Sequence, residues 1–167
     1  VSKVEFEEIW FELKEYTNED FQDFFKIKDE NGMNVLHHLA AFCCSSKNWI
    51  FSKLTGIVKN QEKLKEILLL KSVKSQENAL LISILYKNEF AFFHLFEEVF
   101  CNIFELNEFI YEVDCEGENF FHNVVRHGSL QMLESAFYKL KTHLSREELI
   151  EFLKLRSIGC DNILHMT

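Results

Sequence analysis

Neighbouring histidines and cysteines form the most chemically suggestive cluster in the sequence. His37 and His38 lie up to about two helical turns before Cys43 and Cys44, and a thiol beside an imidazole can serve as a nucleophile. Cys44, however, lies in an apolar stretch that offers no Asn or Asp to orient a histidine, and adjacent cysteines suit a tetrahedral zinc site poorly. We therefore expect neither catalysis nor metal binding here, and we expect reduced, buried thiols.

The remaining sequence lacks the spacings that other catalytic and cofactor sites require. It contains no G-x-S-x-G, P-loop, H-E-x-x-H or dinucleotide-binding pattern. We therefore expect a non-enzymatic protein with no cofactor and no metal. The net charge of −9 in 167 residues disfavours direct nucleic-acid binding and attachment to anionic membranes, whereas a basic protein partner suits it.

Composition predicts an all-α fold. The chain has 18 Phe, only five Gly and no Pro, so it lacks the usual helix breaker and most of the residues that tight hairpins need. No apolar run reaches the length of about 20 residues that spans a membrane, and no signal peptide precedes the first helix. We expect a cytoplasmic or nuclear protein. A first residue of Val and a last segment just after a helix-start signal indicate a trimmed or partial chain.

An internal repeat organises the sequence. Four segments align without gaps on one asparagine, at spacings of 44, 41 and 43 residues. Asparagine is a good N-cap, so each of the four is expected to cap a helix rather than act as a catalytic amide. The four asparagines are Asn34, Asn78, Asn119 and Asn162.

Each period has the same predicted plan of three helices. A short apolar helix follows each asparagine, a longer packing helix comes next, and a third helix closes the unit; Ser145 and Glu148 form a capping-box pattern at the start of one third helix. The first helices are expected at about 35–43, 79–87, 120–127 and 163 onward, the second at 48–57, 89–104 and 129–142, and the third at 60–70, 106–113 and 145–155; residues 5–16 and 17–25 match the second and third helices of a preceding unit.

These units should stack into one helical solenoid, because each has an apolar face that only a neighbour can cover. The predicted single domain, 1–167, comprises a partial repeat at 1–28, repeats at 29–72, 73–113 and 114–156, and the start of another at 157–167.

The third unit resembles an ankyrin repeat. Asp114 and Gly117 stand at the family's turn positions, Asn119 to His122 replace its Thr-Pro-Leu-His tetrapeptide, and Gly128 falls at its inter-helix glycine. The first unit keeps Asp29, Gly32, Leu36 and His37, whereas the second has Leu81 for the histidine and Lys87 for the glycine. The period is about ten residues longer than the family's, so the resemblance implies an ankyrin-like solenoid with an extra helix per repeat.

Long, Phe-rich units of this kind are similar to the divergent viral ankyrin proteins of insect-infecting viruses that mimic I-kappa-B. That similarity implies a host–virus role: the protein would mask a basic segment of a Rel-type transcription factor and so inhibit NF-kappa-B. Divergent ankyrin domains of cellular scaffold or effector proteins look much the same. They would bind an apolar peptide or helix through exposed Phe and Trp, with Trp10 and Trp49 as candidates. Most of the Phe stripes, which are phenylalanines at helical spacing such as Phe90, Phe92, Phe93 and Phe96, should lie in the core.

Two sets of polar residues recur at fixed places in the units. His37, His122 and His165 share one position, so we expect them to satisfy backbone groups between a unit's turn and the next rather than to bind metal or catalyse. Acidic residues recur in the turns that enter the first helices. The resemblance aligns these turns along one edge of a concave face, where they would form either a solubilising edge or a docking strip for a basic segment. The predicted partner-binding residues are Asp29, Glu30, Met33, Glu77, Glu116, Glu118 and Asp161, with Asp114 in the same acidic row.

Overall fold

The computed structural model describes residues 25–42, 61–102 and 109–165, and these residues form an all-α fold. Their only β pairing consists of isolated bridges. The predicted all-α class is therefore confirmed for the described residues. The helices are α3 (Val35–Phe42), α5 (Gln61–Leu68), α6 (Ala79–Leu85), α7 (Glu89–Asn102), α9 (Phe120–His127), α10 (Leu130–His143), α11 (Arg146–Leu153) and the 3-10 turn η2 (Ile163–His165).

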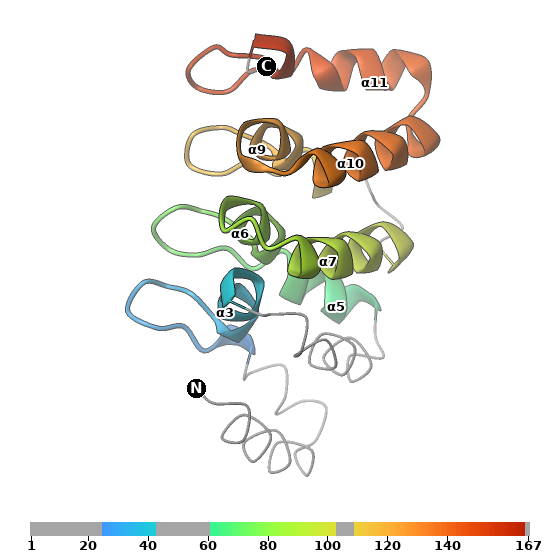
Figure 1. The fold of residues 1–167 in the computed structure, drawn as a ribbon. Coiled ribbons are helices and arrows are strands. Elements are labelled where there is room, and N and C mark those ends of the chain that lie inside the picture. Colours follow the sequence, from blue (N-terminus) through green and yellow to red (C-terminus); the bar gives the residue numbers. More distant parts are fainter. Residues whose placement is uncertain (1–24, 43–60, 103–108, 166–167) are drawn as a thin grey trace.

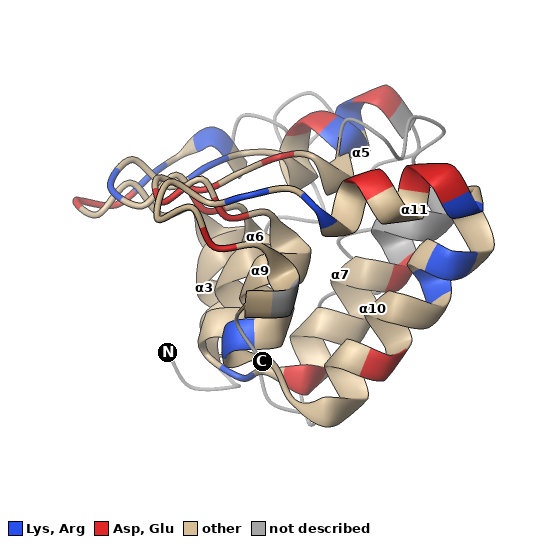
Figure 2. Ribbon diagram, turned by 90° about the horizontal axis from the view of Figure 1, so that it is seen from above, with Lys and Arg blue, Asp and Glu red and all other residues tan. Residues whose placement is uncertain are grey.

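The helices lie in successive layers along the chain (Figure 1). Helices α3, α6 and α9 form one column that η2 continues, and each contacts the next. Helices α7 and α10 lie beside this column and contact each other. Long loops project from the column on the side away from α7 and α10 (Figures 1 and 2).

Most predicted helices within the described residues are confirmed, and their described ends lie within two residues of the expected ones. The helix expected from residue 163 onward is described as a single 3-10 turn. The helix expected at 106–113 is wrong at its end, because helical structure stops at residue 110 and Val113 instead pairs with Asn119 in an antiparallel bridge. The helices expected at 5–16 and 48–57, and nearly all of 17–25, lie outside the described residues, as do Cys43 and Cys44.

Phenylalanine rings join the layers into one core. Phe92 and Phe96 of α7 stack at 5.0 Å between ring centroids, and Phe96 lies 5.9 Å from Phe120 of α9. Phe120 in turn lies 6.3 Å from Phe152 of α11. All four side chains are almost fully buried, which confirms the core role expected for this part of the Phe stripes.

Asparagine side chains cap the first helices as predicted. The N–H of Leu81 donates to Asn78 Oδ1 at 3.0 Å, and the N–H of His122 donates to Asn119 Oδ1 at the same distance. Equivalent bonds link His37 to Asn34 and His165 to Asn162. The recurring asparagine therefore fixes where each first helix or turn begins.

The recurring histidine joins its helix to a backbone carbonyl just before the next projecting loop. The N–H of Asn34 donates to His37 Nδ1 at 3.0 Å, while His37 Nε2 lies 3.0 Å from the carbonyl oxygen of Leu70. A carbonyl can only accept, so Nε2 carries the hydrogen and Nδ1 is the acceptor of a neutral ring. Burial lowers the pKa of His37 and favours this neutral form. The structural role predicted for this histidine is thus confirmed.

Candidate functional site

Four projecting loops, here called fingers, carry every predicted partner-binding residue. They lie one above another beside the α3–α6–α9 column (Figures 1 and 2). Fingers 3 and 4 are each closed at the base by an antiparallel bridge, Val113 with Asn119 and Arg156 with Asn162. In chain order the fingers comprise residues 28–33, 72–77, 113–118 and 156–161.

One residue in each finger adopts a left-handed backbone conformation. The φ angles are 75° at Gly32, 58° at Gln76, 71° at Gly117 and 65° at Cys160. In three fingers the N–H of this residue donates to the carbonyl three residues earlier, at 2.9 to 3.1 Å. A common turn therefore shapes the fingers, although only two of them use the glycine that such a turn favours.

The aspartates at the start of fingers 1 and 3 hold their own turns. Asp29 Oδ1 accepts from the N–H groups of Asn31 and Met33 at 2.8 and 2.9 Å, and Asp114 Oδ1 accepts at 2.9 and 3.0 Å from the two matching amides of finger 3. The backbone hydrogen bond from Met33 holds the pKa of Asp29 below its usual value. Asp29 Oδ2 also lies 2.9 Å from His38 Nε2. These carboxylates therefore already have partners inside their own unit.

Backbone hydrogen bonds join neighbouring fingers. The N–H of Cys115 donates to the Ser75 carbonyl at 3.1 Å, and the N–H of Ile158 donates to the Glu116 carbonyl at 2.9 Å. These two bonds use equivalent positions of the repeat. Fingers 2, 3 and 4 are thus linked into one row, which fixes the spacing of the side chains on them.

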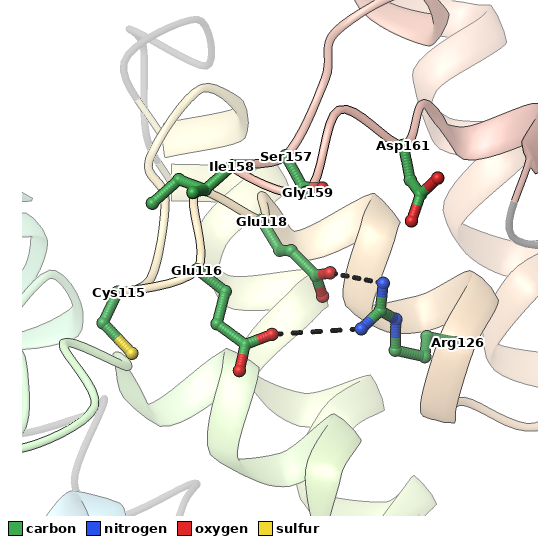
Figure 3. Close-up of a pocket in the computed structure, with 8 residues that line it drawn as sticks. All are labelled: Cys115, Glu116, Glu118, Arg126, Ser157, Ile158, Gly159 and Asp161. Carbon is green, nitrogen blue, oxygen red and sulfur yellow. Dashed lines mark ion pairs between the residues drawn. The ribbon is translucent and has the colours of Figure 1, made fainter.

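An acidic pocket lies between fingers 3 and 4 (Figure 3). Glu118 is only 3% exposed, and its Oε1 lies 2.7 Å from Arg126 Nη2, whereas Glu116 Oε2 lies 3.9 Å from Nη1 of the same guanidinium. Asp161 approaches from finger 4 (Figure 3). The pocket encloses about 360 Å³ and is lined by Cys115, Glu116, Glu118, Arg126, Ser157, Ile158, Gly159 and Asp161.

The pocket holds more negative than positive charge. Burial raises the pKa of Glu118, and repulsion from Asp114, Glu116 and Asp161 raises it further, while Arg126 opposes the shift. Three carboxylates thus line a pocket that contains one guanidinium. This arrangement favours an additional cation at the open side, where Glu116 and Asp161 are exposed.

The residues of the predicted acidic row differ in their exposure to solvent. Glu30, Glu116 and Asp161 are exposed; Glu77 and Met33 are half-buried, and Met33 packs against the core. The Ser75 hydroxyl donates to Glu77, whose pKa is raised by burial. The pocket brings together Glu116, Glu118 and Asp161, whereas the residues of fingers 1 and 2 contribute nothing to its lining.

Sequence reasoning did not consider the cations in and beside this row. Arg126 was not predicted, although its place in the last turn of an apolar helix, facing the acidic turn that precedes it, is a usable signal. Lys74 donates to Asn31 Oδ1 at 2.8 Å and so links fingers 1 and 2. The other fingers contain Lys28, Lys74 and Arg156, whereas finger 3 contains three carboxylates and no Lys or Arg, so negative charge is concentrated on finger 3 rather than spread evenly along the row.

Other chemistry is limited within the part of the chain that the structure describes. Cys115 and Cys160 are exposed free thiols, and the described residues include no His/Cys/Asp/Glu group able to hold a metal ion. No described helix is long and apolar enough to cross a membrane. Comparison of the sequence with protein-family models and with curated proteins finds no match.

Proposed function

We propose that this protein is a non-enzymatic protein-binding module whose finger row docks a basic segment of another protein. The observation that carries the proposal is the pocket between fingers 3 and 4, where Glu116, Glu118 and Asp161 surround a single guanidinium. A Lys or Arg side chain entering from solvent would meet Glu116 and Asp161. Neither Glu30 nor Asp161 has an ion-pair partner among the described residues, so these carboxylates remain available to a ligand.

The proposal treats the layers as repeats of an ankyrin-like solenoid with an extra helix per repeat. Its support is the recurrence of three local features at the same spacing: the asparagine cap, the buried histidine bond and the left-handed finger turn. An extra helix precedes a finger at α5 and again at α11. The repeat boundaries proposed from the sequence place these helices at the ends of units 29–72 and 114–156.

The proposed partner is a basic segment of a Rel-type transcription factor, masked in the manner of I-kappa-B. This narrower identity rests on the sequence resemblance, and the acidic pocket supports only its chemistry. Such a partner would place the protein in the cytoplasm or the nucleus.

A second candidate function is binding of an apolar peptide or helix by α10, which lies with α7 beside the α3–α6–α9 column. Helix α10 exposes Leu130 at 69%, Phe137 at 41% and Tyr138 at 67%. Phe96, the equivalent of Phe137 in the preceding layer, is fully buried. Phe96 is buried because α10 packs against α7, so the exposed apolar residues of α10 form the surface that a next layer or a partner would cover.

Salt and charge variants test the proposed function. The test variant neutralises only exposed finger carboxylates, as Glu30→Gln, Glu116→Gln and Asp161→Asn, because changes at buried Glu118 would disturb the fold. Capture of a Lys/Arg-rich peptide is measured by fluorescence anisotropy at low and high salt. Exposed pairs contribute roughly 0.5 kcal/mol each, so the triple variant should bind about tenfold more weakly at low salt.

The control variant removes three exposed carboxylates elsewhere, as Glu66→Gln, Glu134→Gln and Glu151→Gln. It makes the same change in net charge without touching a finger. If both variants weaken peptide binding equally, the loss of affinity is explained by overall charge, and docking at the fingers is overturned. Binding that resists high salt and the finger changes would instead favour the apolar surface of α10.

A further inference from the structure

Two exposed aromatic rings from neighbouring layers form one surface. Phe42 ends α3 and is 64% exposed, and Tyr86 caps the end of α6 and is 53% exposed. Their ring centroids are 5.3 Å apart in an edge-to-face arrangement. The Phe42 ring also stacks on His38, with 6.4 Å between centroids. We call His38, Phe42 and Tyr86 the aromatic surface.

The aromatic surface contrasts with the ring contacts of the buried core. Phe92, Phe96 and Phe120 are fully or almost fully buried and join layers from inside. Phe42 and Tyr86 also join two layers, but more than half of each side chain faces solvent. Scattered exposed aromatic residues are ordinary, whereas rings held in contact across two helices offer a continuous apolar area to a partner.

Charged groups flank the aromatic surface on two sides. Toward finger 1, the His38 ring is bonded to Asp29, and Glu30 beside it is exposed. At the opposite end of the first helices from the fingers, Lys87 directly follows Tyr86, the C-cap of α6. Carboxylates thus border the finger side of the surface, and Lys87 lies at the other end.

We propose that the aromatic surface anchors a large apolar side chain of the docked segment, while basic residues of the same segment face the fingers. This inference rests on the proposed function, because it adds an anchor to the same basic partner. Charge complementarity supports that choice: the carboxylates on the finger side attract the partner's basic residues, and Lys87 at the other end repels them and so sets the direction of the segment. The expected occupant is a short basic segment that contains Leu, Phe or Trp.

The anchor and the fingers contribute differently to binding. Contact of an apolar side chain with Phe42 and Tyr86 removes apolar area from water and does not depend on ionic strength. Pairing with finger carboxylates is screened by salt and acts mainly on the association rate. A segment that uses both sites should therefore keep part of its affinity at high salt.

A library of random peptides displayed on phage tests the proposal with the whole chain as bait. Selected peptides are expected to be enriched both in Lys or Arg and in Leu, Phe or Trp. Synthetic versions of them should bind Phe42→Ala and Tyr86→Ala about tenfold more weakly, as expected for loss of an anchoring contact, and this factor should persist at high salt.

Tyr138→Ala provides the matched control, because Tyr138 is a similarly exposed ring on α10. It should leave the affinity unchanged, and helix content and thermal midpoint are compared for every variant. Because altered folding could imitate lost binding, the conservative Phe42→Leu variant should retain most of the affinity.

The outcomes separate this inference from the proposed function. Selected peptides that are basic but lack apolar residues, or that ignore Phe42 and Tyr86, overturn the anchor and leave finger docking standing. Apolar peptides without basic residues that depend on Phe42 and Tyr86 overturn finger docking and the basic partner together. Weakening by Tyr138→Ala equal to that by Phe42→Ala moves the contact to α10, and selection of acidic peptides or of none overturns both proposals.

Discussion

A hydrogen bond joins His122, in the α3–α6–α9 column, to Leu155, just before finger 4. His122 Nε2 lies 3.1 Å from the Leu155 carbonyl oxygen, and its Nδ1 lies 3.4 Å from the N–H of Asn119. Leu155 immediately precedes finger 4. The buried imidazole therefore determines where this finger begins, and through it the position of Asp161 in the pocket. His37 performs the same task for Leu70 and finger 2.

Replacing His122 with leucine should destabilise the protein by about 2 kcal/mol, because the Leu155 carbonyl and the Asn119 N–H lose their shared partner. Leu81 occupies the equivalent position in the second unit, so leucine's volume is compatible with this place in the helix. Urea unfolding followed by circular dichroism measures the free energy of unfolding. His165→Leu is the control, since His165 is exposed, and a change below about 0.5 kcal/mol is expected there. Similar losses at both sites would contradict the buried role.

Stability should fall as the pH drops through the range in which histidine titrates. Burial lowers the folded-state pKa of His37 and His122, so between the folded and unfolded pKa values the unfolded state binds more protons. The contribution of the neutral rings is complete above the ordinary pKa of about 6.5 and disappears as the pH falls through the folded pKa.

The unfolding free energy measured from neutral to mildly acidic pH tests this dependence. His122→Leu should remove part of the slope relative to the natural chain. The raised pKa values of Glu77 and Glu118 act in the opposite direction: the stability that their protonation supports is complete below the ordinary glutamate value of 4.5 and is lost above the folded pKa. An unchanged slope in His122→Leu would show that this imidazole does not titrate with folding.

Local signals in the sequence were enough to place the first helices and their caps. Asn78 and Asn119 each precede an apolar segment at nearly constant spacing, and capping depends only on residues within one turn. The end of the helix expected at 106–113 could not be placed in this way. It is set by the pairing of Val113 with Asn119, which requires the finger between them to close.

The candidate site was predicted only as a set of acidic turns. Glu118 is buried against Arg126, whereas Glu116 is exposed. The sequence did not distinguish these two glutamates, because they are only two residues apart in the same polar loop. Likewise, Gln76 and Cys160 carry no residue-type signal for a left-handed turn. Only their alignment with Gly32 and Gly117 indicates it.

Cys160→Gly should stabilise the protein by about 1 kcal/mol. Cys160 has φ 65°, and a side chain with a Cβ is disfavoured there, although glycine's greater freedom in the unfolded chain reduces the gain. Gly117→Ala should have the opposite effect, because φ is 71° and the new Cβ would lie 3.0 Å from Ile158 Cγ1. Thermal and urea unfolding of both variants measure these changes. A loss of stability in Cys160→Gly would show that its left-handed conformation is not strained in solution.

The Glu118–Arg126 pair should show strong coupling in a double-mutant cycle. Arg126→Ala leaves the buried Glu118 carboxylate without its cation and should cost about 2 kcal/mol, less than for a fully buried pair because Arg126 is 37% exposed. The first unit has Met33 and Ala41 at the two equivalent positions. The double variant Glu118→Met/Arg126→Ala copies that apolar arrangement and should lie within about 1 kcal/mol of the natural chain.

Unfolding free energies of the natural chain, both single variants and the double variant complete the cycle. Recovery of stability in the double variant would show that the ion pair is retained for a purpose other than stability, as expected if Arg126 positions Glu116 and Glu118 for a ligand. Binding of a Lys/Arg-rich peptide to the stable double variant then gives a direct test. The net charge of the pocket is unchanged, so weaker binding would come from loss of the guanidinium that positions Glu116. Additive losses would instead contradict the predicted coupling, since each residue would then contribute independently of its partner.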